Sequence, residues 1–167
     1  MNRIVIADAS ALIALAKIEH LFILQGLFGV VWLAPTVLGE LRMAEFAENG
    51  STLQAALDAA WLRVNPAPTA NTALTGLDAG ETESILQALH AKSQGDAVLL
   101  IIDEQTGRAA AKTLGLTIAG TAAVIGMAKQ RGLIQSASAV FEALLKTDFR
   151  ISADIIRQVL VNVGEIK

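Results

Sequence analysis

Residues 97–131 read AVLLIIDEQTGRAAAKTLGLTIAGTAAVIGMAKQR, and this stretch decides the fold class. The run 97–102 is continuously apolar, which is typical of a parallel strand covered on both faces. The pattern then predicts a helix over 107–114, a strand over 116–119 and a helix over 121–131. Strands that alternate with helices, with no hairpin signal between them, indicate a parallel α/β sheet with helices on both sides.

The same alternation extends to the rest of the chain. The sequence predicts further strands at 4–7, 30–33 and 61–64, and a loop rich in Pro, Asn and Thr at 65–76. Further helices are predicted at 11–17, 21–28, 35–48, 51–60, 78–95, 136–146 and 152–163. Their predicted end signals are Ser10, Ser51 and Ser152 as N-caps and Gly50 as the residue that closes the helix before it. Without an internal repeat or linker, we expect residues 1–167 to form a single domain, with about 136–167 as a helical extension.

Composition limits the class of protein. Hydrophobic residues make up 53% of the 167 positions, which is ample for one core. The absence of cysteine excludes disulfides and thiolate metal sites and fits a cytoplasmic location. A net charge of −3 disfavours nucleic-acid binding through overall charge alone. The uncharged stretch 21–38 has the length of a membrane span, but Gln25, Gly26, Gly29 and Pro35 divide it, so no membrane segment is expected.

Acidic side chains follow the predicted strands. Asp8 comes after the first strand, and Asp103 and Glu104 come directly after the run 97–102. In a parallel sheet the carboxyl ends of the strands share one edge, where ligands bind. Glu40 and Glu81 lie in helices expected to begin near that edge. We therefore expect the carboxylates of Asp8, Glu40, Glu81 and Asp103 to converge, with Glu104 beside them, and Asp8 to face this crevice rather than the interior.

Convergent carboxylates repel one another and are tolerated when a cation neutralises them. Oxygen ligands in a chain without cysteine suit Mg²⁺ or Mn²⁺, which can activate water for attack on a phosphodiester. Each acid also has a structural alternative. These alternatives are a helix cap for Asp8, a capping box for Asp78 with Glu81, a solvated helix position for Glu40, and a polar strand end for Asp103 and Glu104.

Two further residues are candidate phosphate ligands. Thr121 follows the last strand at a helix start, where its N–H and hydroxyl could hold a phosphate or a metal-bound water. Its alternative is an ordinary N-cap. Arg108 could reach a phosphate or pair with an acid. The sequence contains none of the glycine-rich phosphate or dinucleotide motifs and no nucleophile elbow.

Four segments resemble the PIN-domain family, in its branch of small prokaryotic toxin-like proteins with long C-terminal helices. They are IADASALIALAKI at 6–18, APTVLGEL at 34–41, LDAGETESILQAL at 77–89, and LLIIDEQTGRAAAKTLGLTIAGTAAVIGMAKQRGLI at 99–134. The resemblance covers nearly the whole chain. It implies a three-layer α/β/α fold with extra C-terminal helices.

The resemblance also implies a Mg²⁺- or Mn²⁺-dependent endoribonuclease that cleaves RNA. In that picture Asp8 and Asp103 bind the metal, and Glu40 and Glu81 hold metal-bound water or a second ion. Ser10 and Thr121 match the small hydroxyl positions beside the metal. The implied partners are a second copy of the chain in a homodimer and a small antitoxin protein.

Two departures from the family pattern keep an alternative open. The branch usually has Asp-Thr-Ser-Pro-Leu where residues 8–12 read DASAL, and often has basic residues where this chain has Gln105 and Thr106. The alternative is a catalytically weak or inactive module that binds metal and partners. A phosphoryl-accepting receiver-like domain is disfavoured, because Gly120 and Thr121 are followed by alanines rather than by the lysine it needs.

Overall fold

The computed structural model describes residues 3–43, 50–66 and 74–167. Its centre is a five-stranded sheet in the order β3-β2-β1-β4-β5, and every neighbouring pair is parallel. The strands are β1 Arg3–Ala7, β2 Val31–Leu33, β3 Leu62–Val64, β4 Ala97–Ile101 and β5 Thr117–Ala119. The predicted parallel sheet is confirmed, and its strand order changes direction between β1 and β4, where ligands bind in sheets of this type.

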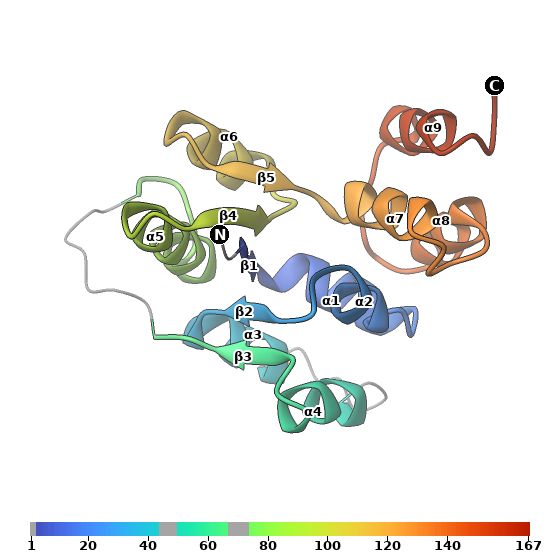
Figure 1. Ribbon diagram of the computed structural model, residues 1–167. Helices are drawn as coiled ribbons and strands as arrows, with labels where there is room; N and C mark the ends of the chain where they lie inside the picture. Colours follow the sequence, from blue (N-terminus) through green and yellow to red (C-terminus); the bar gives the residue numbers. More distant parts are fainter. Residues whose placement is uncertain (1–2, 44–49, 67–73) are drawn as a thin grey trace.

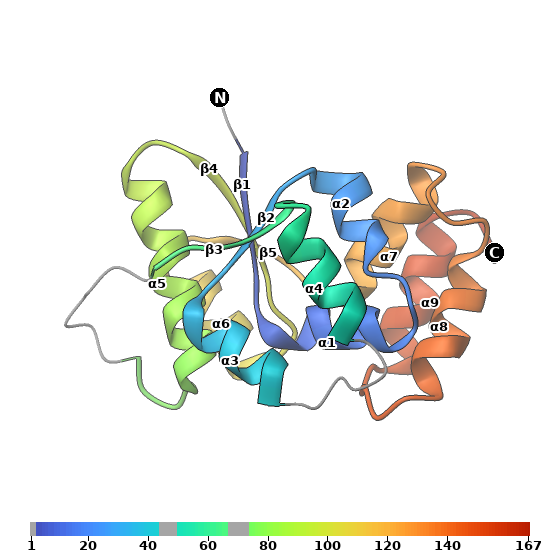
Figure 2. The ribbon, with the colours of Figure 1, turned by 90° about the horizontal axis from the view of Figure 1, so that it is seen from below.

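Helices cover both faces of the sheet (Figure 1, Figure 2). One face carries α5 and α6, the other α1, α2 and α7, with α8 and α9 packed outside α7. The helices are α1 Ala9–Lys17, α2 Phe22–Phe28, α3 Pro35–Met43, α4 Gly50–Asp58, α5 Ala79–Ser93, α6 Gln105–Thr113, α7 Thr121–Gln130, α8 Ala137–Leu145 and α9 Ala153–Asn162. The predicted three-layer α/β/α arrangement with extra C-terminal helices is therefore confirmed.

The two faces of the central strands bury two separate cores. In β1, Val5 and Ala7 join the larger cluster with α1, α2 and α7, whereas Ile6 joins the smaller cluster under α5 and α6. In β4, Leu99 and Leu100 divide between the two clusters in the same way. Side chains of a strand point alternately to its two faces, so a strand covered by helices on both sides must be apolar at successive positions. This is why the run at 97–102 has no polar residue.

Several predicted boundaries differ from the structure. Ser10 is not an N-cap, because α1 begins at Ala9 and Asp8 occupies the N-cap position. Gly50 does not close a helix and Ser51 is not a cap, since both lie inside α4. The predicted cap Ser152 is confirmed, with its hydroxyl accepting from the Ile155 N–H at 3.2 Å.

Other differences concern where helices begin and end. The helix predicted from residue 107 begins two residues earlier, at Gln105. The predicted end of the third helix near Glu48 and the middle of the loop 65–76 fall outside the described residues. The uncharged stretch 21–38 divides into α2, β2 and the start of α3. Among the helices of the described ranges, none is long and apolar enough to cross a membrane.

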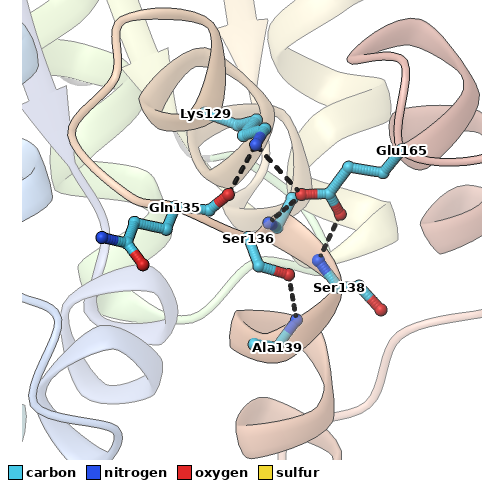
Figure 3. A network of polar contacts seen from close by, with 7 residues as sticks. Lys129, Gln135, Ser136, Ser138, Ala139 and Glu165 are labelled. Carbon is cyan, nitrogen blue, oxygen red and sulfur yellow. Dashed lines mark hydrogen bonds and ion pairs between the residues drawn. The ribbon is translucent and has the colours of Figure 1, made fainter.

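A carboxylate near the C-terminus holds the helical extension together (Figure 3). Glu165 accepts hydrogen bonds from the backbone N–H groups of Ala137 and Ser138, at 2.7 and 2.8 Å, in the first turn of α8. Lys129, at the end of α7, lies 3.5 Å from the same carboxylate. Partial burial would raise the pKa of Glu165, but these N–H groups and Lys129 hold it below its usual range. One side chain therefore joins the C-terminal tail to α7 and α8.

We predict that Glu165→Gln lowers the free energy of unfolding by about 1 kcal/mol at pH 7, because helix-terminal N–H groups lose a charged acceptor. Because the folded-state pKa is depressed, this stability is present above the pKa of the unfolded chain and is lost as the pH falls through the folded value. Urea denaturation of the wild type and of Glu165→Gln at pH 7 and pH 4 measures this difference in stability. The matched control is Glu142→Gln, an exposed acid of α8; an equal loss in both variants would contradict the assignment.

Candidate functional site

The carboxyl ends of β1, β4 and β5 come together at the switch point. The Asp8 N–H donates to the carbonyl of Ile101 at 2.9 Å, and the Ile102 N–H donates to the carbonyl of Ala119 at 2.9 Å. The strand pairing therefore continues by one residue past β1 and β4. This places Asp8 at the exit of β1 and Asp103 just beyond β4, at the same edge of the sheet, as predicted.

Asp8 is buried, with only 4% of its surface exposed, so the expectation that it faces the open crevice is wrong. Acidic residues of α3 and α5 lie close enough to act on it. Within the described residues its Oδ1 atom has no hydrogen-bond partner. Asp8 also makes no side-chain capping bond, so capping does not account for it. A buried carboxylate oxygen without a partner is unfavourable and needs a cation or a proton.

The pKa of Asp8 is raised to about 7. The largest cause is burial, which disfavours the charged form, and the nearby Ala9 N–H only partly offsets it. The charges of Asp78, Glu40 and Glu81 raise it further. These four acids therefore form one electrostatic cluster, which we call the acidic cluster.

Glu40 reaches the acidic cluster from α3 because residue 80 is glycine. A Cβ atom at Gly80 would lie 2.5 Å from Glu40 Oε1 and would push this carboxylate away from the first turn of α5. Burial, followed by the charges of Asp78, Glu81 and Glu83, raises the pKa of Glu40. Glu40 is thus partly buried among acids, and the alternative of a merely solvated helix position does not describe it.

Glu81 has both of the roles considered for it. Asp78 and Glu81 form a capping box at the start of α5: Asp78 Oδ1 accepts from the Glu81 N–H at 2.8 Å, and Glu81 Oε2 accepts from the Asp78 N–H at 3.2 Å. The structural alternative is therefore confirmed. Glu81 is nevertheless buried in the cluster, where burial first and then Asp78 and Glu104 raise its pKa, although the Asp78 N–H lowers it.

Two acids of this region were missed as site residues. Asp78 was considered only as a cap, although its charge acts on Asp8, Glu40 and Glu81. Glu83 accepts from the Thr36 N–H at 3.0 Å and so joins the first turn of α3 to α5. The spacing D-x-x-E-x-E at 78–83 contained the signal, but only the packing of α3 against α5 shows which acids meet.

Asp103 lies in a different environment from Asp8. Its Oδ1 accepts from the Thr121 N–H at 2.8 Å, and its Oδ2 accepts from the Thr121 hydroxyl at 2.7 Å. Burial raises the pKa of Asp103, while these bonds and the charge of Arg108 oppose the rise. Thr121 is fully buried, so its hydroxyl positions Asp103 rather than standing open to a phosphate. Thr121 is not the N-cap of α7 either, because Gly120 occupies that position.

Gly120 lets Arg108 and Asp103 approach the start of α7. A Cβ atom there would lie 3.0 Å from Asp103 Oδ1 and 3.1 Å from Arg108 Nη1. Arg108 Nη1 donates to the carbonyl of Ile102 at 2.9 Å, which holds the guanidinium beside this edge. Arg108 therefore lies beside Asp103, and its role as a phosphate ligand stays a prediction.

Two cavities flank Asp103, of about 350 and 380 Å³. Ser10 and Glu104 line the smaller one, and Arg108 lines the larger one. Phe149 and Arg150, from the connection between α8 and α9, line both. These two residues were missed, because no local motif links residues 149–150 to Asp103, and the extension brings them there only in three dimensions.

The predicted convergence of four carboxylates is thus only partial. Asp8, Glu40 and Glu81 act on one another together with Asp78, whereas Asp103 is influenced by Arg108 and Glu104. Glu104 links the two groups, since its charge raises the pKa of both Glu81 and Asp103. Among the residues that the structure describes, no three acids or histidines are arranged to hold one metal ion.

The donor set still fits a hard divalent cation bound together with a substrate. Mg²⁺ keeps several waters and is bound through one or two carboxylates plus substrate phosphates, so it does not need a closed cage of protein ligands. The unpartnered Oδ1 of Asp8, surrounded by like charges, is the atom that such an ion would satisfy. Asp8 would be the principal ligand, with Glu40 and Glu81 close to it.

These features define a class: an all-parallel α/β protein with an acidic cluster at its switch point. The chain belongs to the PIN-domain family, because the family DUF3368, a PIN domain, matches residues 4–165. The family inferred from the four sequence segments is therefore confirmed. PIN domains are generally nucleases and typically use divalent metals.

A PilT N-terminus domain protein from the hyperthermophilic archaeon Sulfolobus solfataricus P2 is similar in structure, with a TM-score of 0.48 and 16% sequence identity. The similarity covers 89% of this chain and 99% of that one. No curated protein matches the sequence significantly.

We predict that Asp8→Asn stabilises the metal-free protein at pH 8. The pKa of Asp8 is about 7 in the folded chain against an ordinary 3.8, so the folded state favours the protonated carboxyl. The stability that this group contributes is fully present below about pH 4 and is lost as the pH rises through about 7. This difference between the folded-state and unfolded-state pKa corresponds to a change of as much as about 4 kcal/mol in the free energy of unfolding between pH 4 and pH 8. Urea denaturation in chelator from pH 4 to pH 8 should show a flatter profile for the variant.

The control for this experiment is Asp58→Asn, which makes the same replacement of a carboxylate by an amide at an exposed position of α4. It should leave the pH profile unchanged. If Asp8→Asn also left the pH dependence of stability unchanged, the ionised Asp8 carboxylate would not destabilise the folded chain as its burial indicates.

Proposed function

We propose that this protein is a Mg²⁺- or Mn²⁺-dependent endoribonuclease. The observation that carries the proposal is the buried, unpartnered carboxylate of Asp8 among Glu40, Asp78 and Glu81 at the switch point of the sheet. A cluster of this kind is costly without a cation and suited to one. Membership in the PIN-domain family supports nuclease chemistry.

The residues divide the chemistry among them. A divalent cation, when bound, would polarise a phosphate oxygen and make water a better nucleophile. Asp8 would bind the ion in its ionised form. Glu81 has one carboxylate oxygen outside the capping box, and its raised pKa suits it to accept a proton from the attacking water. Thr121 keeps Asp103 oriented at the neighbouring strand end.

Cations beside the acids support a polyanionic substrate. Arg108 and Arg150 both line the larger cavity next to Asp103. Guanidinium groups bind phosphate through paired N–H donors, and they offset the repulsion that an acidic site exerts on a nucleic-acid backbone. These arginines would supply positive charge that the sequence lacks at Gln105 and Thr106.

The first test is cleavage of a mixed-sequence RNA by the purified chain. We expect cleavage with Mn²⁺ or Mg²⁺, none with chelator, and a loss of at least about 100-fold for Asp8→Asn and for Glu81→Gln. Glu142→Gln is the control that should retain full activity. Cleavage that persists in chelator or in Asp8→Asn would exclude the mechanism.

The same variants separate the nuclease from the non-catalytic alternative. Thermal denaturation should show Mn²⁺ stabilising the wild type but not Asp8→Asn, because a ligand that binds only the folded state raises stability by mass action. Stabilisation without cleavage of any RNA would favour a module that binds metal and partners. If Mn²⁺ gave no stabilisation and no RNA were cleaved, both the nuclease and the metal-binding module would be excluded.

A second prediction concerns the path of the RNA backbone. Arg150→Ala should lower kcat/KM about tenfold at low salt and reduce the salt dependence of binding by about one phosphate contact. Arg157→Ala is the matched control, because this exposed arginine of α9 lines neither cavity beside Asp103. Equal effects of the two substitutions would show that only overall charge matters.

The biological setting is a further part of the proposal. We propose a cytoplasmic toxin that acts as a homodimer and is inhibited by a small antitoxin. Exposed apolar side chains on the C-terminal extension, Leu145, Ile155, Val161 and Ile166, are consistent with a protein partner there. Sedimentation of the purified chain, and growth of cells expressing it with and without any small open reading frame that lies beside its gene, test these points.

A further inference from the structure

A further pocket, of about 610 Å³, lies away from the acidic cluster. It is lined by residues of β1, β2 and β3 and of the C-terminal half of α5, and it reaches Asp96 just before β4. None of the acids assigned above lines it. Its volume is within the range of small-molecule sites. We call it the Gln87 pocket.

Gln87 gives this pocket a polar group without a partner. The residue is only 4% exposed, and its Nε2 atom donates to the backbone carbonyl of Asn65. Because a carbonyl only accepts hydrogen bonds, this contact assigns the amide orientation and leaves Oε1 as an acceptor. Oε1 has no partner among the described residues. Buried amide oxygens are normally satisfied, so Gln87 Oε1 is a free acceptor that the donor of a ligand would satisfy.

An aromatic ring and positive charges line the same pocket. The Arg63 guanidinium lies 5.6 Å from the centre of the Trp32 ring, and Arg63 Nε donates to the carbonyl of Ala60 at 2.6 Å, which holds it there. Arg3 adds a cationic group and His90 an imidazole, and Asp96 is the one acid among the described lining residues. The pocket therefore offers a planar stacked surface and anion-binding groups in a protein that is acidic overall.

We propose that the Gln87 pocket binds a nucleotide. A nucleobase supplies the N–H donor that Gln87 Oε1 lacks and a flat ring for the Trp32 and Arg63 surface, and its phosphate supplies the negative charge that Arg3 and Arg63 attract. These three features reside together in a nucleotide, whereas inorganic phosphate has no ring and a nucleoside has no charge. The nucleotide is either free or one unit of an RNA strand.

Trp32 makes binding directly observable. Its fluorescence should change saturably with AMP, GMP, CMP or UMP in the presence of chelator, which removes metal-dependent binding at the acidic cluster. Inorganic phosphate and adenosine, tested separately, should bind at least about tenfold more weakly than the matching nucleotide. A short single-stranded RNA is tested in the same way. Tighter binding of the RNA than of the mononucleotide identifies the pocket as an RNA contact, and weaker binding of the RNA identifies a site for a free nucleotide.

Substitutions of the lining residues test whether the nucleotide binds in the Gln87 pocket. Arg63→Ala, at an exposed position, and Gln87→Met, which keeps the side-chain length, should each weaken binding about tenfold by calorimetry. Arg157→Ala and Gln54→Met are the matched controls and should bind normally. Thermal denaturation checks that Gln87→Met is folded, and Arg63→Ala tests the pocket independently if it is not.

Three results would overturn the proposal: no saturable signal with any nucleotide up to about 10 mM, equal affinity for inorganic phosphate, or unchanged binding in both pocket variants. The Glu81→Gln protein distinguishes this proposal from the nuclease. It should bind nucleotide at the Gln87 pocket even though it no longer cleaves RNA, so that either proposal can fail without the other.

Discussion

The burial of the Asp8 carboxylate at the end of the central strand is the constraint on which the rest of the site depends. Its Oδ1 atom has no partner among the described residues, and three other acids act on it through α3 and α5. A charge in this position destabilises the folded chain unless a proton or a cation neutralises it. The raised pKa and the proposed metal binding are two consequences of this one arrangement, and a proton and the metal ion compete for Asp8 because the ion needs the ionised carboxylate.

The neighbouring contacts hold the acids close to one another. Gly80 makes room for Glu40, the capping box fixes Glu81 at the start of α5, and Glu83 ties α5 to α3. At the next strand end, Thr121 binds both oxygens of Asp103. The residues that look structural by themselves are therefore the ones that position the acidic groups.

Acidic and basic side chains are unevenly distributed over two separate regions of the molecule. The acidic cluster and the cavities beside Asp103 lie at the carboxyl edge, where the C-terminal extension contributes Arg150. The Gln87 pocket is cationic and aromatic and lies on the face beside α5. The net charge of −3 conceals this separation, because it sums over both regions. Local fields, rather than net charge, decide which part of the surface meets an anion.

The sequence by itself determined the parallel sheet, the family and the identity of most of the acids, because strand and helix periodicity, capping signals and strand-end positions are local properties. It placed Asp8 and Asp103 at one edge, yet it did not show that Asp8 is buried or that Asp103 is bound by Thr121. It also missed Asp78, Arg150 and the unpartnered Gln87. Only the tertiary structure decided these points, since burial, pKa and missing partners depend on which distant helices close over a side chain, and no spacing along the chain encodes that packing.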